Sequence, residues 1–147
     1  MQGRPRRSVL YMPGSNARAL EKAKTIAADA FIFDLEDAVA PDAKLLAREQ
    51  VCAAVKGGGY GGREIVIRVN ALETPWGVDD LLAACQAEPD AILVPKVVHP
   101  GDIISTANIL QGVHVAFAAR CAAASPMLVD GTLGRRVSVN PTGSIGD

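Results

Sequence analysis

Four short, mostly apolar runs recur along the first two thirds of this chain, each followed by a stretch whose apolar residues have helical spacing. The runs lie at residues 8–13, 31–33, 63–70 and 91–97. The stretches between and after them predict helices over 16–28, 78–87 and 102–110, and from Pro41 to the glycines at 57–59. Strands that alternate with helices in this way are typical of a parallel sheet with right-handed crossovers. The sequence therefore predicts an α/β fold.

Two α/β architectures fit this order, a (β/α)₈ barrel and an open doubly wound sheet. Neither a GxGxxG nor a Walker pattern follows the first run, which disfavours a nucleotide-binding sheet. An eight-unit barrel typically needs about 200 residues or more, whereas this chain has 147. We expect the first four to five β/α units of a TIM-type barrel, with residues 1–110 as the barrel half. Residues 111–147 have a different composition, and we expect them to form a divergent, irregular tail.

The overall composition argues against several classes of partner. The net charge is −1, so there is no electrostatic basis for binding nucleic acid or an anionic membrane. No apolar stretch is long enough to span a bilayer or to serve as a signal sequence. Cys52, Cys85 and Cys121 form no CxxC pair, which favours a reducing compartment over disulfides or zinc. We therefore expect a cytoplasmic protein.

Polar or turn-forming residues end each predicted strand. In chain order they are Pro13 and Gly14, then Asp34, Glu36 and Asp37, then Arg68 and Asn70, then Lys96. The carboxyl ends of parallel strands meet on one rim, which carries the active site in a β/α barrel, so we expect a site there. The alternative is a structural network in which Glu36 or Asp37 pairs with Arg68 or Lys96, because buried carboxylates need a partner.

The residue types at this rim suit a small anionic substrate. The guanidinium of Arg68 presents a fork that matches a carboxylate, and acids beside it can bind Mg²⁺ through oxygen ligands. A carboxylate clamp with a Lewis acid is what carbon–carbon lyase or enolate chemistry on oxo- or hydroxy-acids requires. The turn PGSN at 13–16 either places main-chain N–H groups near a phosphate or simply opens a helix capped by Ser15.

Four blocks of the sequence carry a family resemblance: RSVLYMPGSNARALEKA, DLEDAVAPDAK, RVNALETPWG and DAILVPKV. In order and spacing they resemble the citrate lyase beta-subunit-like members of the HpcH/HpaI aldolase/citrate lyase family. The resemblance implies a TIM-type barrel that is usually a homo-oligomer and depends on Mg²⁺. It also implies cleavage or formation of a 3-hydroxyacyl-CoA thioester of the citryl-, malyl- or citramalyl-CoA type, with an acyl thioester and an oxo-acid as products.

The resemblance also assigns roles to individual residues. Arg68 resembles the arginine that holds the oxo-acid carboxylate, and it is the catalytic candidate. Tyr11 and Arg18, on either side of the PGSN turn, match positions that contact the substrate or its CoA moiety. Lys96 matches a lysine on the rim and is a further substrate-binding candidate.

The metal-binding half of the family's pattern is incomplete in this chain. Glu36 and Asp37 match an acidic pair beside the metal centre, where we expect them to act through water. In the family the direct Mg²⁺ ligands are a glutamate that ends strand five and an aspartate beyond it. We predict strand five at 114–118, but no Asp or Glu lies between Asp102 and Asp130. The sequence therefore predicts weak or absent Mg²⁺ binding by this chain.

These departures leave several functions open. The leading hypothesis is a truncated lyase whose amino-terminal half is joined to an unrelated end, although the tail can instead pair two half barrels across a dimer. A second hypothesis is a non-catalytic oxo-acid-binding or assembly module, which the missing metal ligands favour. A third is a CoA-independent, pyruvate-type aldolase of the same superfamily, which the PGSN opening disfavours.

Overall fold

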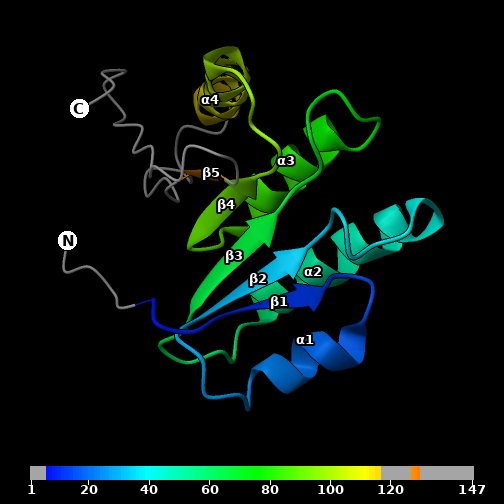
Figure 1. Cartoon of the computed structure of the whole chain (residues 1–147), viewed down its shortest axis with the longest axis vertical. Helices are drawn as coiled ribbons and strands as arrows, with labels where there is room; N and C mark the ends of the chain where they lie inside the picture. Colours follow the sequence, from blue (N-terminus) through cyan, green and yellow to red (C-terminus); the bar gives the residue numbers. More distant parts are fainter. Residues whose placement is uncertain (1–5, 117–126, 130–147) are drawn as a thin grey trace.

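A computed structural model describes residues 6–116 and 127–129 of the chain, with side-chain contacts for residues 6–112. The strands are β1 (Val9–Pro13), β2 (Ala30–Asp34), β3 (Glu64–Arg68), β4 (Ala91–Val94) and β5 (Met127–Val129). The helices are α1 (Ala17–Ala23), the 3₁₀ helix η1 (Pro41–Ala43), α2 (Lys44–Gly57), α3 (Gly77–Ala87) and α4 (Pro100–Ala116). Strands and helices therefore alternate as the sequence predicts (Figure 1).

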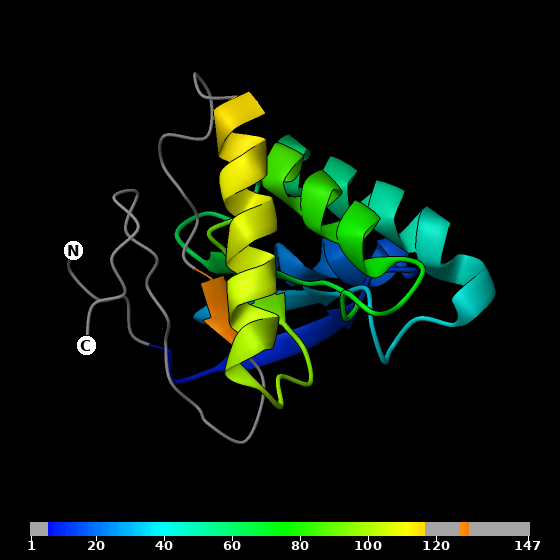
Figure 2. The same cartoon turned by 90° about the horizontal axis from the view of Figure 1, so that it is seen from above.

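The five strands form one parallel sheet in the order β1-β2-β3-β4-β5. Helices α2, α3 and α4 lie on the same face of this sheet (Figure 2). An open doubly wound sheet would reverse its strand order at a switch point and carry helices on both faces. A sequential order with helices on one face is the arrangement of a (β/α)₈ barrel. The TIM-type prediction is confirmed over these five strands.

Alternate residues of each strand face two different layers. Phe31 and Phe33 of β2 belong to the main core, which lies between the sheet and the helices. A smaller buried cluster occupies the other face and consists of Ile32, Val66, Ala91 and Leu93. Because successive side chains of a strand point to opposite faces, Asp34 and Arg68 share the face of the smaller cluster. The strand ends therefore present their charged side chains away from the helices.

The prediction of a strand at 114–118 is wrong over its described residues. Helix α4 continues to Ala116, past the predicted end at 110, and the fifth strand is Met127–Val129, parallel to β4. Residues 117 and 118 lie outside the described part of the chain. A short apolar run does not distinguish a strand from a helix by its periodicity. Here the run extends a helix that has already begun.

Two other predicted boundaries also shift. Helix α1 ends at Ala23 rather than near residue 28. Its N-cap is Asn16 rather than Ser15, because Oδ1 of Asn16 accepts a hydrogen bond from the N–H of Ala19 at 3.1 Å. Strand β4 ends before Pro95, which has no N–H to donate to a neighbouring strand.

Two sequence-based statements concern residues that the structure does not describe. Cys121 and Asp130 both lie outside the described ranges, so what we expect of them stays a prediction. Cys52 and Cys85 are described, and both lie in partly buried positions. Of the helices within the described ranges, none combines the length and the apolar character that crossing a bilayer requires.

Candidate functional site

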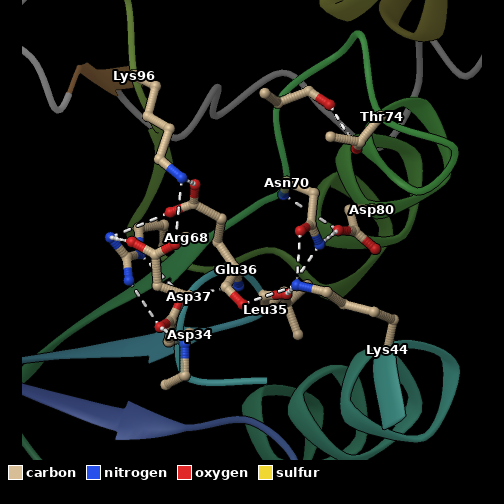
Figure 3. A network of polar contacts seen from close by, with 12 residues as sticks. Asp34, Leu35, Glu36, Asp37, Lys44, Arg68, Asn70, Thr74, Asp80 and Lys96 are labelled. Atoms are coloured by element: carbon tan, nitrogen blue, oxygen red, sulfur yellow. Dashed lines mark hydrogen bonds and ion pairs between the residues drawn. The ribbon is translucent and has the colours of Figure 1, made fainter. Parts of the chain in front are cut away.

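Charged side chains gather where β2, β3 and β4 end, at one rim of the sheet (Figure 3). We name five of them the rim cluster: Asp34, Glu36, Asp37, Arg68 and Lys96. The strand register begins the assembly, because the last residue of β2 lies opposite the last residue of β3. The loops that follow β2 and β4 add the rest. The structure thus brings together the acids and cations that the sequence places at separate strand ends.

Arg68 and Asp34 form a buried ion pair with two hydrogen bonds. Nε and Nη2 of Arg68 donate to Oδ1 and Oδ2 of Asp34 at 2.8 and 2.7 Å. Asp34 is only 1% exposed, and it also accepts the main-chain N–H groups of Glu36 and Ala38. Burial raises the pKa of Asp34, but the hydrogen bonds from Arg68 and from the two N–H groups outweigh burial and lower the pKa overall. The same contact raises the pKa of Arg68, so the pair stays charged.

The other two acids of the rim cluster share their cations. Nζ of Lys96 lies 2.7 Å from Oε1 of Glu36 and 3.1 Å from Oδ1 of Asp37, and these contacts raise the pKa of Lys96. Nη1 of Arg68 lies 3.2 Å from Oε2 of Glu36. That oxygen is buried and accepts no hydrogen bond within the described part of the chain. Three carboxylates and two cations leave the rim cluster with one excess negative charge.

The two substrate contacts predicted near the first turn differ in position. The ring of Tyr11 lies against the guanidinium of Arg68, with 4.9 Å between the ring centroid and Cζ, and about half of Tyr11 is exposed. Arg18 is exposed in the first turn of α1. No ion pair described here joins Arg18 to the rim cluster. The structure therefore brings Tyr11 to Arg68 and leaves Arg18 apart.

A second polar network lies behind the rim cluster, where α2 begins. Lys44 and Asp80 are buried, and Nε of Arg48 donates to Oδ1 of Asp80 at 2.7 Å. The sequence predicts Lys44 and Arg48 on the solvent-facing side of the helix and Leu46 in its apolar stripe. These assignments are wrong, since Lys44 is buried, the side chain of Arg48 is 14% exposed and Leu46 is 50% exposed. The buried residues of α2 are Lys44, Ala47 and Val51, which lie at i, i+3 and i+7 on one face of the helix, and Leu46 lies off that face.

Sequence reasoning placed Asp34 at the rim but missed its pairing with Arg68, and it missed the role of Lys44 altogether. Asp34 carried a usable signal, because it ends a buried strand two residues before Glu36 and needs a cationic partner. Arg68, at the end of the next strand, was the available partner. Lys44 carried no such signal, since a lysine near the start of a helix is ordinarily solvated.

The described residues do not fit a direct magnesium site. The carboxylate oxygens of Glu36 already face Nζ of Lys96 and Nη1 of Arg68, and both oxygens of Asp34 accept hydrogen bonds from Arg68. Within the described ranges, no three His, Cys, Asp or Glu side chains are grouped so that they could hold an ion. The positive charges that this part of the rim offers to a ligand are therefore those of arginine and lysine.

Comparison with known sequences identifies the family of this chain. Residues 7–129 match the HpcH/HpaI aldolase/citrate lyase family. A (3S)-malyl-CoA thioesterase of Cereibacter sphaeroides is 48% identical over 112 residues, which cover 76% of this chain and 39% of the relative. The citrate lyase subunit beta of Escherichia coli is 41% identical over 101 residues, which cover 69% of this chain and 33% of the relative. The chain thus spans about a third to two fifths of these relatives.

A solved structure supports the same placement. The citrate lyase beta subunit from Mycobacterium tuberculosis, complexed with oxaloacetate and magnesium, matches 97% of this chain and 69% of its own length. The TM-score is 0.59 and the sequence identity is 26%. The fold and the family agree between sequence and structure.

Proposed function

This chain belongs to the HpcH/HpaI aldolase/citrate lyase family, and we propose that its rim cluster is the oxo-acid-binding part of a site for 3-hydroxyacyl-CoA thioesters. The proposed reaction is carbon–carbon cleavage of a citryl-, malyl- or citramalyl-CoA type substrate to an acyl thioester and an oxo-acid. Two relatives named as a malyl-CoA thioesterase and a citrate lyase subunit support this substrate class.

The observation that carries the proposal is the fixed guanidinium of Arg68. Asp34 holds Nε and Nη2, and Tyr11 lies against one face of the group. An oxo-acid carboxylate would bind from the Nη1 side, where Oε2 of Glu36 lies at 3.2 Å and Oδ2 of Asp37 at 3.8 Å. A guanidinium that is already held in one orientation loses little freedom when it binds an anion. Because the rim cluster has an excess negative charge, the ligand carboxylate would take the place of Oε2 of Glu36 beside Nη1, and Oε2 would then face the 3-hydroxyl of the substrate.

The proposed cleavage breaks the bond between C2 and C3 of the substrate. The 3-hydroxyl loses its proton and becomes the carbonyl of the oxo-acid, while the electron pair of the broken bond forms the enolate of the acyl thioester. That enolate then takes up a proton at C2. Arg68 would hold the carboxylate of the oxo-acid, and Lys96 would place a second positive charge near the developing negative oxygen. Glu36, through Oε2, is the candidate acceptor for the hydroxyl.

A specific observation favours a second candidate, hydrolysis of the thioester without carbon–carbon cleavage. The relative that is 48% identical carries the name thioesterase. Hydrolysis releases free CoA thiol and leaves the hydroxy-acid intact, whereas carbon–carbon cleavage keeps the thioester on the acyl fragment. The products therefore separate the two reactions.

Several properties of the whole protein belong to the proposal as well. A magnesium ion, which the family resemblance implies, would need ligands from beyond the described residues or from another subunit. We propose a homo-oligomer in the cytoplasm that has no nucleic-acid or membrane partner. A non-catalytic oxo-acid-binding module remains the alternative if binding occurs without turnover, and a pyruvate-type aldolase if turnover needs no CoA.

The test is an assay of the purified chain with malyl-, citramalyl- and citryl-CoA, with and without Mg²⁺. Oxo-acid, acyl thioester and free thiol are measured separately, and glyoxylate, oxaloacetate and pyruvate binding is followed by calorimetry. We expect Arg68→Lys to weaken oxo-acid binding by about tenfold to a hundredfold, because lysine cannot keep both the Asp34 contact and the ligand contact.

The matched control is Arg7→Lys, which alters an exposed arginine–aspartate pair at the opposite end of the sheet. Binding should be unchanged in that variant. A folded wild-type chain that neither binds an oxo-acid nor cleaves any of the three thioesters would contradict the proposal. Equal affinity of the wild type and Arg68→Lys would remove Arg68 from the site.

A further inference from the structure

The ammonium of Lys44 has a hydrogen-bond acceptor for each of its three hydrogens. Nζ donates to the main-chain oxygen of Leu35 at 2.8 Å, to that of Glu36 at 2.7 Å and to Oδ1 of Asn70 at 2.8 Å (Figure 3). Lys44 is only 6% exposed, and Nζ lies 5.3 Å from the centroid of the Trp76 ring. A buried lysine is costly unless its donors are satisfied, and here all three are.

The acceptors of Lys44 belong to the segment that presents the acids of the rim cluster. The oxygens of Leu35 and Glu36 lie at consecutive positions directly after β2, so one ammonium holds both peptide groups. Leu35 is also tied to β3, because its N–H donates to the oxygen of Arg68 at 2.9 Å and its oxygen accepts from Nδ2 of Asn70 at 2.8 Å. The peptide groups on either side of the Glu36 Cα are thus held by hydrogen bonds, both from Lys44 and one also from Asn70.

Among the described residues, no carboxylate contacts the Lys44 ammonium directly. Asn70 separates it from Asp80, since Nδ2 of Asn70 donates to Oδ2 of Asp80 at 2.6 Å, and Arg48 pairs with the other oxygen of Asp80. Desolvation lowers the pKa of Lys44, while Asp34, Asp80, Glu36 and Asp37 oppose that effect through space. The ammonium therefore serves two peptide groups and one amide rather than a salt bridge.

We propose that Lys44 is a positioning residue of the rim cluster, which sets the place of the Glu36 carboxylate against Arg68 and Lys96 by holding the carbonyl groups of Leu35 and Glu36. The proposal rests on the proposed function only in that the Glu36 carboxylate is part of the oxo-acid site. Without the ammonium, the carbonyl of Glu36 loses a donor and the segment after β2 is free to relax. The carboxylate of Glu36 would then move from its position beside Arg68 and Lys96.

The test compares Lys44→Met with the wild-type full chain in two measurements. Amide hydrogen exchange reports on local opening, and we expect the N–H groups of Glu36 and Ala38 to exchange about tenfold faster or more in the variant, with little change at Ile67 in the middle of β3. Calorimetry with glyoxylate and oxaloacetate should show an affinity loss of about tenfold, the change that 1.4 kcal/mol produces.

Two controls separate positioning from a general loss of stability. Lys24→Met removes another lysine that lies over an aromatic ring, with Nζ 5.6 Å from the centroid of Tyr60, away from the rim. Ile65→Ala destabilises the core at the start of β3 without touching the rim cluster. Neither control should change exchange at Glu36 or the oxo-acid affinity in the folded protein. Equal effects of Ile65→Ala and Lys44→Met would overturn the positioning role.

The outcomes also distinguish this inference from the proposed function. If the wild type binds no oxo-acid, the proposed function fails, while faster exchange confined to Glu36 and Ala38 in Lys44→Met still supports the positioning role. Uniformly faster exchange would overturn that role. If Lys44→Met does not fold, NMR of the Lys44 ammonium in the wild-type chain tests the role instead. A slowly exchanging Lys44 ammonium signal with couplings to the carbonyls of Leu35 and Glu36 supports the role, and a rapidly exchanging one overturns it.

Discussion

The two ends of the sheet carry their charges in different ways. Where the strands begin, Arg6 pairs with Glu64 and Arg7 pairs with Asp29, and we call these the base ion pairs. In the base ion pairs each cation meets one acid. In the rim cluster three acids share two cations. Asp34 at its centre is buried, and Glu64 at the base is buried as well.

The base ion pairs have the character of charges that stabilise the fold, whereas the rim cluster has the character of charges that can bind a ligand. Asp29 accepts the main-chain N–H groups of Arg7 and Ser8, so that base ion pair anchors the segment entering β1, and its charge is balanced. The rim cluster keeps an excess negative charge and a buried oxygen of Glu36 without a described hydrogen bond. Shared, imperfectly satisfied acids are what a binding site tolerates. The comparison supports a ligand at the rim and none at the base.

The largest expected contrast between the two ends comes from removing one acid at each. We expect Asp34→Ala to lower the free energy of unfolding by about 3–5 kcal/mol, because it removes the buried carboxylate that accepts hydrogen bonds from Nε and Nη2 of Arg68. Asp29→Ala should cost far less, since Arg7 is 79% exposed and water replaces its partner. Urea unfolding of the two variants measures the difference. Similar losses would show that the Asp34–Arg68 pair contributes no more to the free energy of unfolding than the Asp29–Arg7 pair.

A smaller contrast comes from the glycines at the two ends. A Cβ on Gly14, at the rim, would lie 2.7 Å from the main-chain oxygen of Asp34 and 2.8 Å from Cγ2 of Val51. We expect Gly14→Ala to lower the free energy of unfolding by about 1–3 kcal/mol through overpacking. A Cβ on Gly62, before β3, would have no neighbour within 4 Å, so Gly62→Ala should stay within about 0.5 kcal/mol of the wild type.

Thermal or urea unfolding of both glycine variants checks this contrast. A tolerated Gly14→Ala would mean that the first turn is not packed tightly against the end of β2. The turn at Gly14 and the end of β2 would then have room for an added methyl group.

The smallest expected effect is a pH dependence from the base ion pairs. The side-chain hydrogen bond from Arg7, with the main-chain N–H of Arg7 and Ser8, lowers the pKa of Asp29 from 3.8 to about 2. A lowered folded-state pKa gives stability that is present above pH 4 and is lost as the pH falls toward 2. We expect the wild type to lose more stability than Asp29→Asn over this range.

Urea midpoints measured between pH 2 and pH 6 test this, and Asp34 is present in both proteins, so it cancels in the difference. Parallel pH curves for the wild type and Asp29→Asn would show that the base pair contributes no such linkage. The stability of the base ion pairs would then show no dependence on pH in this range.

Much of the rim was predictable from the sequence because strand ends are local features. Glu36, Asp37, Arg68 and Lys96 each follow an apolar run, and parallel strands bring such positions to one edge. Which acid takes which cation was not predictable. Asp34, rather than Glu36 or Asp37, holds Nε and Nη2 of Arg68, because the register places the two strand-end residues opposite each other.

The sequence by itself determined the order of the first four strands and their helices and the layers that the strand side chains face, because periods of about 2 and 3.6 residues are properties of the local chain. Only the tertiary structure decided that 114–116 extends a helix, that Lys44 lies in the interior, and that its ammonium meets Leu35, Glu36 and Asn70. These outcomes depend on contacts between segments far apart in the chain, and local spacing carries no information about such contacts.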